Sequence, residues 1–276
     1  MSDIDMLIDG EAVSHVPATD RGLHYGDGVF ETIAVLDGQP VLWPEHRARL
    51  AEGCTRLGLP APAGDILDAE VATLSRGHAR AVVKVVVTRG SGGRGYAPPP
   101  EPIPMRLVAR YPWPEYPTEW LKRGVRVRTC RTRLGCNPAL AGIKHLNRLE
   151  HVLARAEWDD PDIAEGLMCD PAGNVIEGTM SNVFCVQGGV LRTPQLSQCG
   201  VAGIMRAQLL PLAEEAGLAA TEHALSLAEV RAADEVLLCN SIIGLWRVRE
   251  LDGRSLAPGP MAHALAERLR AHWPLL

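Results

Sequence analysis

Two residues of this chain carry groups that could do chemistry together, a lysine and a glutamate. Lys144 lies in Ala-Gly-Ile-Lys-His-Leu-Asn-Arg-Leu-Glu, residues 141–150, at the head of a predicted helix. Glu177 ends a predicted strand within Asn-Val-Ile-Glu-Gly-Thr-Met-Ser-Asn-Val-Phe, residues 174–184. An amine that forms a Schiff base and an acid that faces a pyridine nitrogen are what pyridoxal phosphate (PLP) requires from a protein. Taken singly, a surface lysine and a solvated turn glutamate are the ordinary interpretations.

A PLP site also needs a group that holds the phosphate, and the chain offers three candidates. Gly-Val-Ala-Gly-Ile-Met-Arg, residues 200–206, runs from a turn into a predicted helix, whose first N–H groups and positive dipole end favour an anion. Cys-Asn-Ser-Ile, residues 239–242, is a polar turn after a predicted strand. Arg49 is a candidate cationic clamp. A helix start, a strand end and a solvated arginine are the structural alternatives.

A glycine-rich loop, Thr-Arg-Gly-Ser-Gly-Gly-Arg-Gly-Tyr at residues 88–96, follows a predicted buried strand. It lacks the spacing and the Lys-Ser/Thr pair of a phosphate-binding P-loop. It is also shorter than the disordered Arg-Gly-Gly tracts that bind nucleic acid. We interpret it as a pocket-lining loop in which an arginine pairs with a substrate carboxylate, and a mobile surface loop is the alternative.

Composition excludes several classes of protein. Among 276 residues, 22% are charged and 46% apolar, and the net charge of −5 argues against a nucleic-acid partner. No apolar run approaches the roughly 18 residues of a membrane span, and the N-terminal residues lack the layout of a signal peptide. The seven cysteines are scattered and form no Cys-x-x-Cys pair, and the nine histidines do not cluster. We therefore expect reduced thiols, no metal site and a cytoplasmic location.

The elements that must position these groups are predicted from periodicity and turn signals. In the N-terminal part, strands are predicted at 6–8, 28–36, 39–43, 81–88 and 105–110, with a helix beginning at Pro44 and another capped by Asp65 and ending at Ser75. In the C-terminal part, strands are predicted at 125–130, 166–169, 174–177, 182–186, 190–192 and 235–240, with helices at 146–158, 203–216 and 261–272. Strands and helices without regular βαβ alternation predict an α+β fold.

Three prolines at positions 112, 114 and 117 predict a stiff linker between two domains. We expect a smaller N-terminal α+β domain over residues 1–111 and a linker over 112–118. A larger C-terminal, PLP-binding domain is expected over residues 119–276.

The motifs, taken together, resemble fold-type IV PLP enzymes, which include branched-chain aminotransferases, D-amino-acid transaminases and aminodeoxychorismate lyases. The resemblance rests on residues 20–32, on Glu45, His46, Arg49 and Leu50, on Lys144 with Asn147 and Arg148, on residues 177–182 and on residues 203–206. It implies a two-domain D-amino-acid aminotransferase-like fold, with mixed sheets or a barrel flanked by helices. It also implies a homodimer.

The same resemblance implies roles for individual residues. Lys144 would be the Schiff-base lysine and the proton-transfer group, and Glu177 would pair with the pyridine nitrogen. The phosphate would be held by Arg49, Ile204, Met205, Asn240 and Ser241, while Thr179 and Met180 would line the ring. Arg94 and Tyr96 are the candidates for the substrate carboxylates, and His24, Phe30 and Thr32 for the pocket lining. For His145, packing or solvent contact is preferred to a catalytic role.

Residues 88–96 and 133–150 are similar to the aminodeoxychorismate lyases in particular. The implied activity is conversion of the small-molecule substrate 4-amino-4-deoxychorismate into 4-aminobenzoate and pyruvate. A transaminase acting on D- or branched-chain amino acids is the alternative, although Tyr96 stands where D-amino-acid transaminases have a carboxylate-binding histidine. A non-catalytic protein that uses the glycine–arginine loop on nucleic acid is the third hypothesis.

Overall fold

The computed structural model describes residues 5–273, and the chain forms two compact units. The first unit contains Met1–Pro114 together with Ile143–Asn147, and the second contains Glu115–Gly142 and Arg148–Leu276. The division after Pro114 lies within the predicted linker of residues 112–118. The segment Ile143–Asn147 nevertheless belongs to the first unit, so the units are not two uninterrupted stretches of chain. Lys144 lies in this returning segment.

The first unit is built on an antiparallel five-stranded sheet with the order β1-β5-β4-β2-β3. Its strands are β1 (Met6–Ile8), β2 (Gly28–Leu36), β3 (Gln39–Pro40), β4 (Arg80–Thr88) and β5 (Met105–Pro112). The valine-rich β4 lies between β2 and β5 and pairs with both, as its β-branched residues favour. The β2–β3 hairpin turns at Asp37 and Gly38, which both have positive φ.

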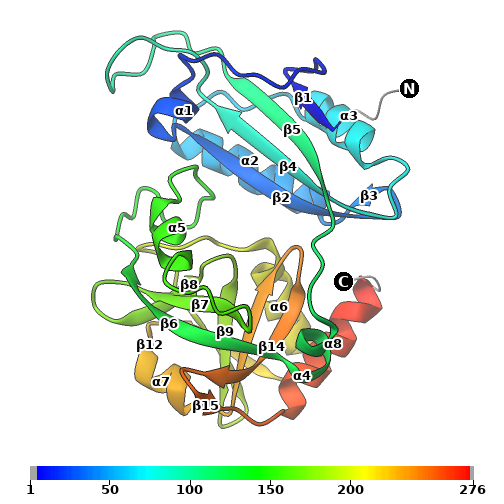
Figure 1. Ribbon diagram of the computed structural model, residues 1–276, viewed down its shortest axis with the longest axis vertical. Helices are drawn as coiled ribbons and strands as arrows, with labels where there is room; N and C mark the ends of the chain where they lie inside the picture. The colour runs from blue at the N-terminus through cyan, green and yellow to red at the C-terminus, as the bar shows by residue number, and fades with distance from the viewer. Residues whose placement is uncertain (1–4, 274–276) are drawn as a thin grey trace. The chain divides into compact units, whose positions relative to one another are not determined.

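Two helices, α2 (Trp43–Arg56) and α3 (Gly64–Ser75), cover one face of this sheet (Figure 1). Their apolar side chains pack with alternate residues of β2 and β4 to form the core of the unit. The predicted strand at 39–43 was too long, because Pro44 sets the first helical turn and Trp43 already belongs to α2. The predicted cap was also wrong. Asp65 lies inside the first turn of α3, and no described side chain caps the helix at Ala63.

The second unit is built on a mixed ten-stranded sheet with the order β11-β10-β9-β13-β14-β6-β7-β8-β12, and β15 pairs with β14. Its strands are β6 (Val125–Arg133), β7 (Ile163–Cys169), β8 (Asn174–Gly178), β9 (Asn182–Gln187), β10 (Val190–Pro194), β11 (Ala219–His223), β12 (Leu225–Ser226), β13 (Glu235–Asn240), β14 (Gly244–Leu251) and β15 (Arg254–Ser255). The pairs β6–β7, β6–β14 and β10–β11 are parallel and the others antiparallel. Mixed sheets with flanking helices confirm the predicted α+β class.

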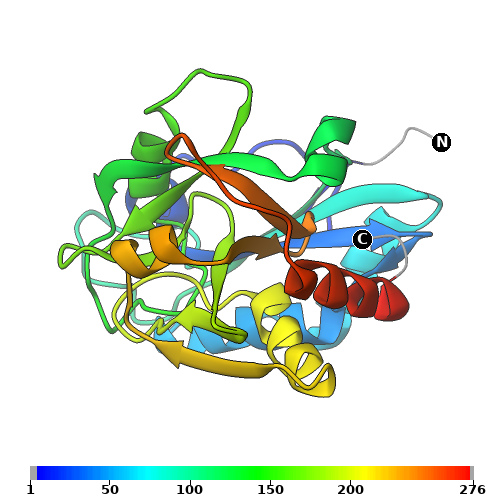
Figure 2. The same ribbon diagram turned by 90° about the horizontal axis from the view of Figure 1, so that it is seen from below.

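Five helices belong to the second unit: α4 (Thr118–Arg123), α5 (Leu149–Arg155), α6 (Ile204–Glu215), α7 (Leu227–Ala232) and α8 (Pro260–His272). Figure 2 shows α6 and α8 side by side, and the two helices are in contact. The main core of the unit surrounds Trp246, which is 2% exposed. No helix formed by residues 5–273 has both the length and the apolar character needed to cross a bilayer.

The predicted helix at 146–158 was wrong at both ends, since α5 covers only Leu149–Arg155. Lys144 is therefore not at the head of a helix. Its carbonyl accepts a hydrogen bond from Phe30 N at 2.9 Å, and Leu146 N donates to Gly28 O at 3.0 Å. These bonds hold the segment against β2, where paired backbone groups outweigh local helix propensity.

Candidate functional site

Lys144 is placed over an aromatic ring of the first unit. Its Nζ atom lies 4.5 Å from the centroid of the Phe30 ring. The Nζ atom of Lys84, from β4, lies 5.2 Å from the same centroid. Thr32 faces the same side of the sheet as Phe30 and pairs with Lys84 in register. Lys144, Phe30 and Thr32, predicted separately, are thus brought together, and Lys84 is an unpredicted second cation beside them.

Arg49 is held by a buried carboxylate on the opposite side of β2. Its Nε and Nη2 atoms donate to the two oxygens of Glu31 at 2.8 and 2.6 Å. His46 Nδ1 lies 2.6 Å from Glu31 Oε2, and both Glu31 and His46 are buried. Burial pushes the pKa of Glu31 upward, but Arg49 and His46 outweigh burial and lower this pKa to about 2. The guanidinium of Arg49 is therefore fixed by an ionised partner.

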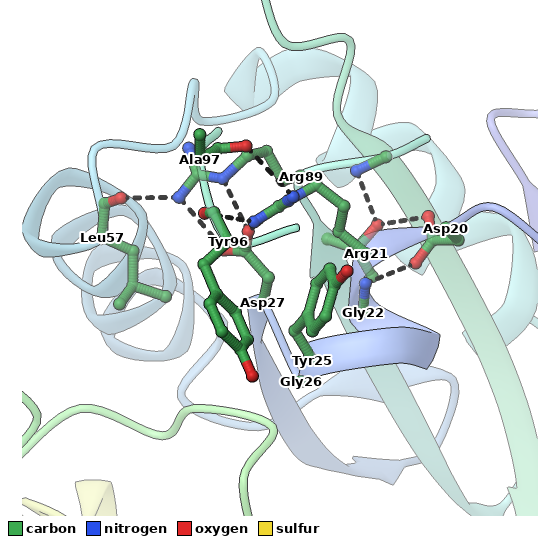
Figure 3. Close-up of polar contacts among 12 residues, drawn as sticks. Asp20, Arg21, Gly22, Tyr25, Gly26, Asp27, Leu57, Arg89, Tyr96 and Ala97 are labelled. Carbon is green, nitrogen blue, oxygen red and sulfur yellow. Dashed lines mark hydrogen bonds and ion pairs between the residues drawn. The ribbon is translucent and has the colours of Figure 1, made fainter. Parts of the chain in front are cut away.

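The loop that carries Arg94 and Tyr96 is attached to helix α1 (Arg21–Tyr25) by Arg21, an arginine to which the sequence analysis gave no role of its own (Figure 3). Arg21 donates from Nη1 to Gly95 O at 3.0 Å and from Nη2 to Tyr96 O at 3.0 Å. A further bond reaches Ala97 O at 3.3 Å. The side chain of Tyr96 stays 85% exposed. Arg21 thus orders the backbone of the loop and leaves its side chains accessible.

Arg21 is in turn oriented by Asp27, which also binds Arg89 (Figure 3). Arg21 Nε and Arg89 Nε donate to Asp27 Oδ2 at 2.9 and 2.8 Å. Burial raises the pKa of Asp27, but the two guanidinium groups outweigh burial and leave this pKa below its ordinary value. The helix α1 (Arg21–Tyr25) begins at Asp20, whose carboxylate accepts from Gly22 N at 2.8 Å. His24, in α1, is exposed, and its Nε2 lies 2.6 Å from Ala18 O.

Glu177 lies near the end of β8 in the second unit and is 3% exposed. Its Oε2 atom accepts from Val201 N at 2.9 Å, and its Oε1 atom lies 3.0 Å from His151 Nε2. His151 comes from α5, the helix that follows the lysine segment. The carboxylate is therefore held in one orientation by a backbone amide and an imidazole, and the sequence had not indicated the imidazole.

The start of α6 supplies backbone donors close to this carboxylate in the fold. No described side chain caps the helix at Gly203, so its first turn begins with N–H groups that suit an anion. Ile204 and Met205, the first residues of α6, are buried. Asn182 Nδ2 donates to Val201 O at 2.9 Å and fixes the turn that leads into the helix.

A buried glutamate shapes the turn between β8 and β9. Glu165 is fully buried in β7, and its Oε1 accepts from Thr179 N at 2.9 Å. Its Oε2 accepts from Met180 N at 3.0 Å and from Ser181 Oγ at 2.8 Å. The Thr179 hydroxyl also bonds to Glu165. The sequence analysis missed this role. A signal for it was present, because Glu165 is the single carboxylate within the apolar strand Ile-Ala-Glu-Gly-Leu-Met-Cys.

Asn240 and Ser241 lie where β13 ends, and Asn240 connects this turn to the one at Met180. Asn240 Nδ2 donates to Met180 O at 2.9 Å, and its Oδ1 accepts from Ile242 N at 2.8 Å. The second unit therefore brings together Glu177, the start of α6 and the turns at 179–180 and 240–241. The first unit separately groups Lys144 with Phe30 and Thr32, Arg49 with Glu31, and Arg94 with Tyr96 on one loop.

Comparison with known proteins identifies the family. Residues 28–251 match the sequence profile of amino-transferase class IV. This chain belongs to the class IV aminotransferase family. The match confirms the predicted relationship to fold-type IV enzymes.

Three relatives of this class IV chain show how far the similarity extends. It is 39% identical to an aminodeoxychorismate lyase of Vibrio harveyi over 240 residues, which cover 86% of this chain and 88% of the relative. The crystal structure of 4-amino-4-deoxychorismate lyase from Pseudomonas aeruginosa is 48% identical, with a TM-score of 0.92 over 96% of this chain and 98% of that one. The Escherichia coli branched-chain amino acid aminotransferase is 27% identical, with a TM-score of 0.87 over 99% and 95% of the two chains.

Proposed function

We propose that this chain is a PLP-dependent lyase that converts 4-amino-4-deoxychorismate into 4-aminobenzoate and pyruvate, a reaction of folate biosynthesis. The observation that carries the proposal is its identity of 39% and 48% with two lyases of that name over most of the chain. Identity with the branched-chain aminotransferase, over a similar share of the chain, is 27%.

The described residues fit PLP. When bound, the cofactor supplies an aldehyde for the substrate amine and a protonated ring that accepts electrons. Glu177, buried and oriented by His151 and Val201 N, suits a protonated ring nitrogen. The uncapped start of α6, at Ile204 and Met205, suits the phosphate. We assign Arg49, Asn240 and Ser241 to the phosphate as well, and Thr179 and Met180 to the ring.

Lys144 is the group we assign to proton transfer. Its neutral amine would take the proton from C4 of the substrate, and the ring of Phe30 and the cation of Lys84 form its surroundings. The neutral amine is the form that can accept a proton. As the C4 proton leaves, the enolpyruvyl ether at C3 departs and the carbocycle becomes aromatic. The residues of the protein mainly have to orient the C4–H bond.

Substrate recognition is assigned to the first unit. Arg94 and Tyr96 would contact the carboxylates of the substrate, on the loop that Arg21 holds by three carbonyls. Phe30 and Thr32 share the sheet face near Lys144 and would line the pocket, together with His24.

The test is incubation of the purified, PLP-loaded protein with 4-amino-4-deoxychorismate while 4-aminobenzoate and pyruvate are measured. We expect equimolar products, and a loss of about a thousandfold in rate for Lys144→Ala, because proton transfer by a positioned base is lost. Lys122→Ala, a lysine in α4, is the matched control and should retain the rate. If no 4-aminobenzoate forms while D-alanine or leucine converts the cofactor to its amine form, the chain is a transaminase instead.

We further propose a cytoplasmic homodimer. The family resemblance supports the dimer, and the cysteines support a reducing compartment, since all seven are free thiols and six are buried. Light scattering on the eluted protein should give twice the chain mass of 29.8 kDa. A mass equal to that of one chain would contradict the dimer.

A further inference from the structure

The second unit contains a basic cavity outside the residues assigned to catalysis. The cavity has a volume of about 580 Å³ and lies among α4, β14 and α8. Its walls include five cationic side chains: Lys122, Arg123, Arg247, Arg249 and Arg270. None of the residues that line it is an aspartate or glutamate. We call it the basic cavity.

The positive charge of the basic cavity is largely uncompensated. Among the described residues, Lys122, Arg247, Arg249 and Arg270 form no ion pair, and Arg123 only approaches Glu119 at 3.8 Å on the exposed side of α4. The carboxylate of Glu235, which acts electrostatically on Arg247, already accepts from Met261 N at 3.0 Å and Ala262 N at 2.8 Å. Such a concentration of cations is unexpected in a chain whose net charge is −5.

Two of the guanidinium groups are fixed in position by the fold. Arg247 and Arg249 alternate on β14 with the buried Trp246 and Val248, so they point away from the core. Arg249 Nε donates to Gly124 O at 3.1 Å, and Arg247 Nη2 donates to Arg123 O. Through these bonds, one nitrogen of each guanidinium group holds the end of α4. They leave Arg247 Nη1, which is buried and has no hydrogen bond to any described residue.

A cavity lined by cations that form no ion pair with the described residues favours an anion, which charge-assisted hydrogen bonds would hold. Burial lowers the pKa of Arg247, which reflects the cost of a desolvated charge that an anion would offset. The cavity also has apolar walls at Leu121, Leu245, Leu256 and Pro258, and its volume lies in the range of small-molecule sites.

We propose that the basic cavity binds a small organic polyphosphate, with its phosphates on Arg247, Arg249 and Arg270 and its apolar part against the leucines. The proposal is independent of the lyase activity, because none of these residues is assigned to the cofactor or substrate.

The experiment is calorimetric titration of the PLP-loaded protein with ADP and, separately, with tripolyphosphate, at low salt. We expect one saturable site per chain without a change in the absorption of the bound cofactor. Arg270→Gln and Arg249→Gln should each weaken binding about tenfold, as loss of a charge-assisted hydrogen bond predicts. Arg268→Gln is the matched control, because Arg268 is also on α8 but faces Glu215 at 3.9 Å and does not line the cavity.

Tighter binding of ADP than of tripolyphosphate would support an organic ligand that contacts the apolar walls, and equal binding would overturn that part of the proposal. The absence of saturable binding of either probe would overturn the proposal. So would an equal loss of affinity in Arg268→Gln, since that result would indicate a diffuse charge effect. The rate of 4-aminobenzoate formation is measured on the same variants, so that a failure of the binding proposal can be distinguished from a failure of the proposed lyase function.

Discussion

Glu177 depends on His151 for one of its two fixed contacts, so His151 should act as a positioning residue. His151→Ala removes the group 3.0 Å from Glu177 Oε1, while the bond from Val201 N remains. We expect the dissociation constant of PLP to rise about tenfold, the usual effect of losing an outer partner of a cofactor ligand. His151→Gln, which can still donate to the carboxylate, should recover most of the affinity. Titration of the apoprotein with PLP by absorbance is the measurement, and equal affinities for Ala and wild type would contradict this role.

Glu31 should make the first unit sensitive to acid. Its pKa in the folded protein is about 2, against an ordinary value of 4.5, so the unfolded chain binds its proton more readily. The stabilisation is therefore complete above pH 4.5 and is lost as the pH falls towards 2, by about 3 kcal/mol in total.

The measurement is the urea midpoint between pH 3 and 6 for the wild type and for Glu31→Gln. The substitution should lower stability at neutral pH, because Arg49 and His46 then lose the ionised carboxylate of Glu31. It should also flatten the dependence of stability on pH. A variant with the same slope as the wild type would show that other carboxylates dominate.

At the scale of elements, the loop at residues 91–99 is ordered by a side chain from α1 rather than by its own glycines. Arg21→Lys keeps the positive charge beside Asp27. The single ammonium group of lysine cannot, however, bond to the three carbonyl oxygens that the planar guanidinium group of Arg21 reaches. We expect trypsin to cleave after the exposed Arg94 about ten times faster, and KM to rise more than kcat falls.

Arg89→Lys is the matched variant for this loop. Arg89 shares Asp27 with Arg21, but its other bonds go to Leu57 O and Gly58 O, not to the loop. Cleavage after Arg94 should therefore stay close to the wild-type rate. Similar acceleration in both variants would mean that Asp27, and not the carbonyl contacts, controls the loop.

At the scale of the whole molecule, the two units are connected by more than one linker. The chain leaves the first unit after Pro114 and returns for Ile143–Asn147. In that segment Ile143 is 1% exposed, and two backbone bonds join it to β2. A fragment of residues 1–114 would lose this buried side chain and these bonds.

We expect that fragment to melt about 10 °C or more below a version extended by residues 141–148 through a Gly-Ser linker. Thermal unfolding, monitored by circular dichroism, gives the melting temperatures of the fragment and of the extended version. Equal midpoints would show that the returning segment does not stabilise the first unit.

The sequence by itself determined the identity of the chemical groups and much of the local structure. Lys144 and Glu177 were singled out by residue type and context, and the strand at 28–36 and its Asp37-Gly38 turn followed from local rules. The ordered motifs also predicted the family that residues 28–251 confirm. The inferences about local structure and family succeeded because alternation, turn preferences and motif order are properties of short stretches of chain.

Only the tertiary structure decided how these groups are held. Lys144 was predicted at the head of a helix over residues 146–158, yet the bonds that Phe30 N and Leu146 N donate hold Lys144 in a non-helical segment against β2. The partners Lys84, His151 and Glu165 were missed for the same reason. Each lies far from its partner in the sequence, and only the pairing of strands and the burial of charge bring such groups within bonding distance.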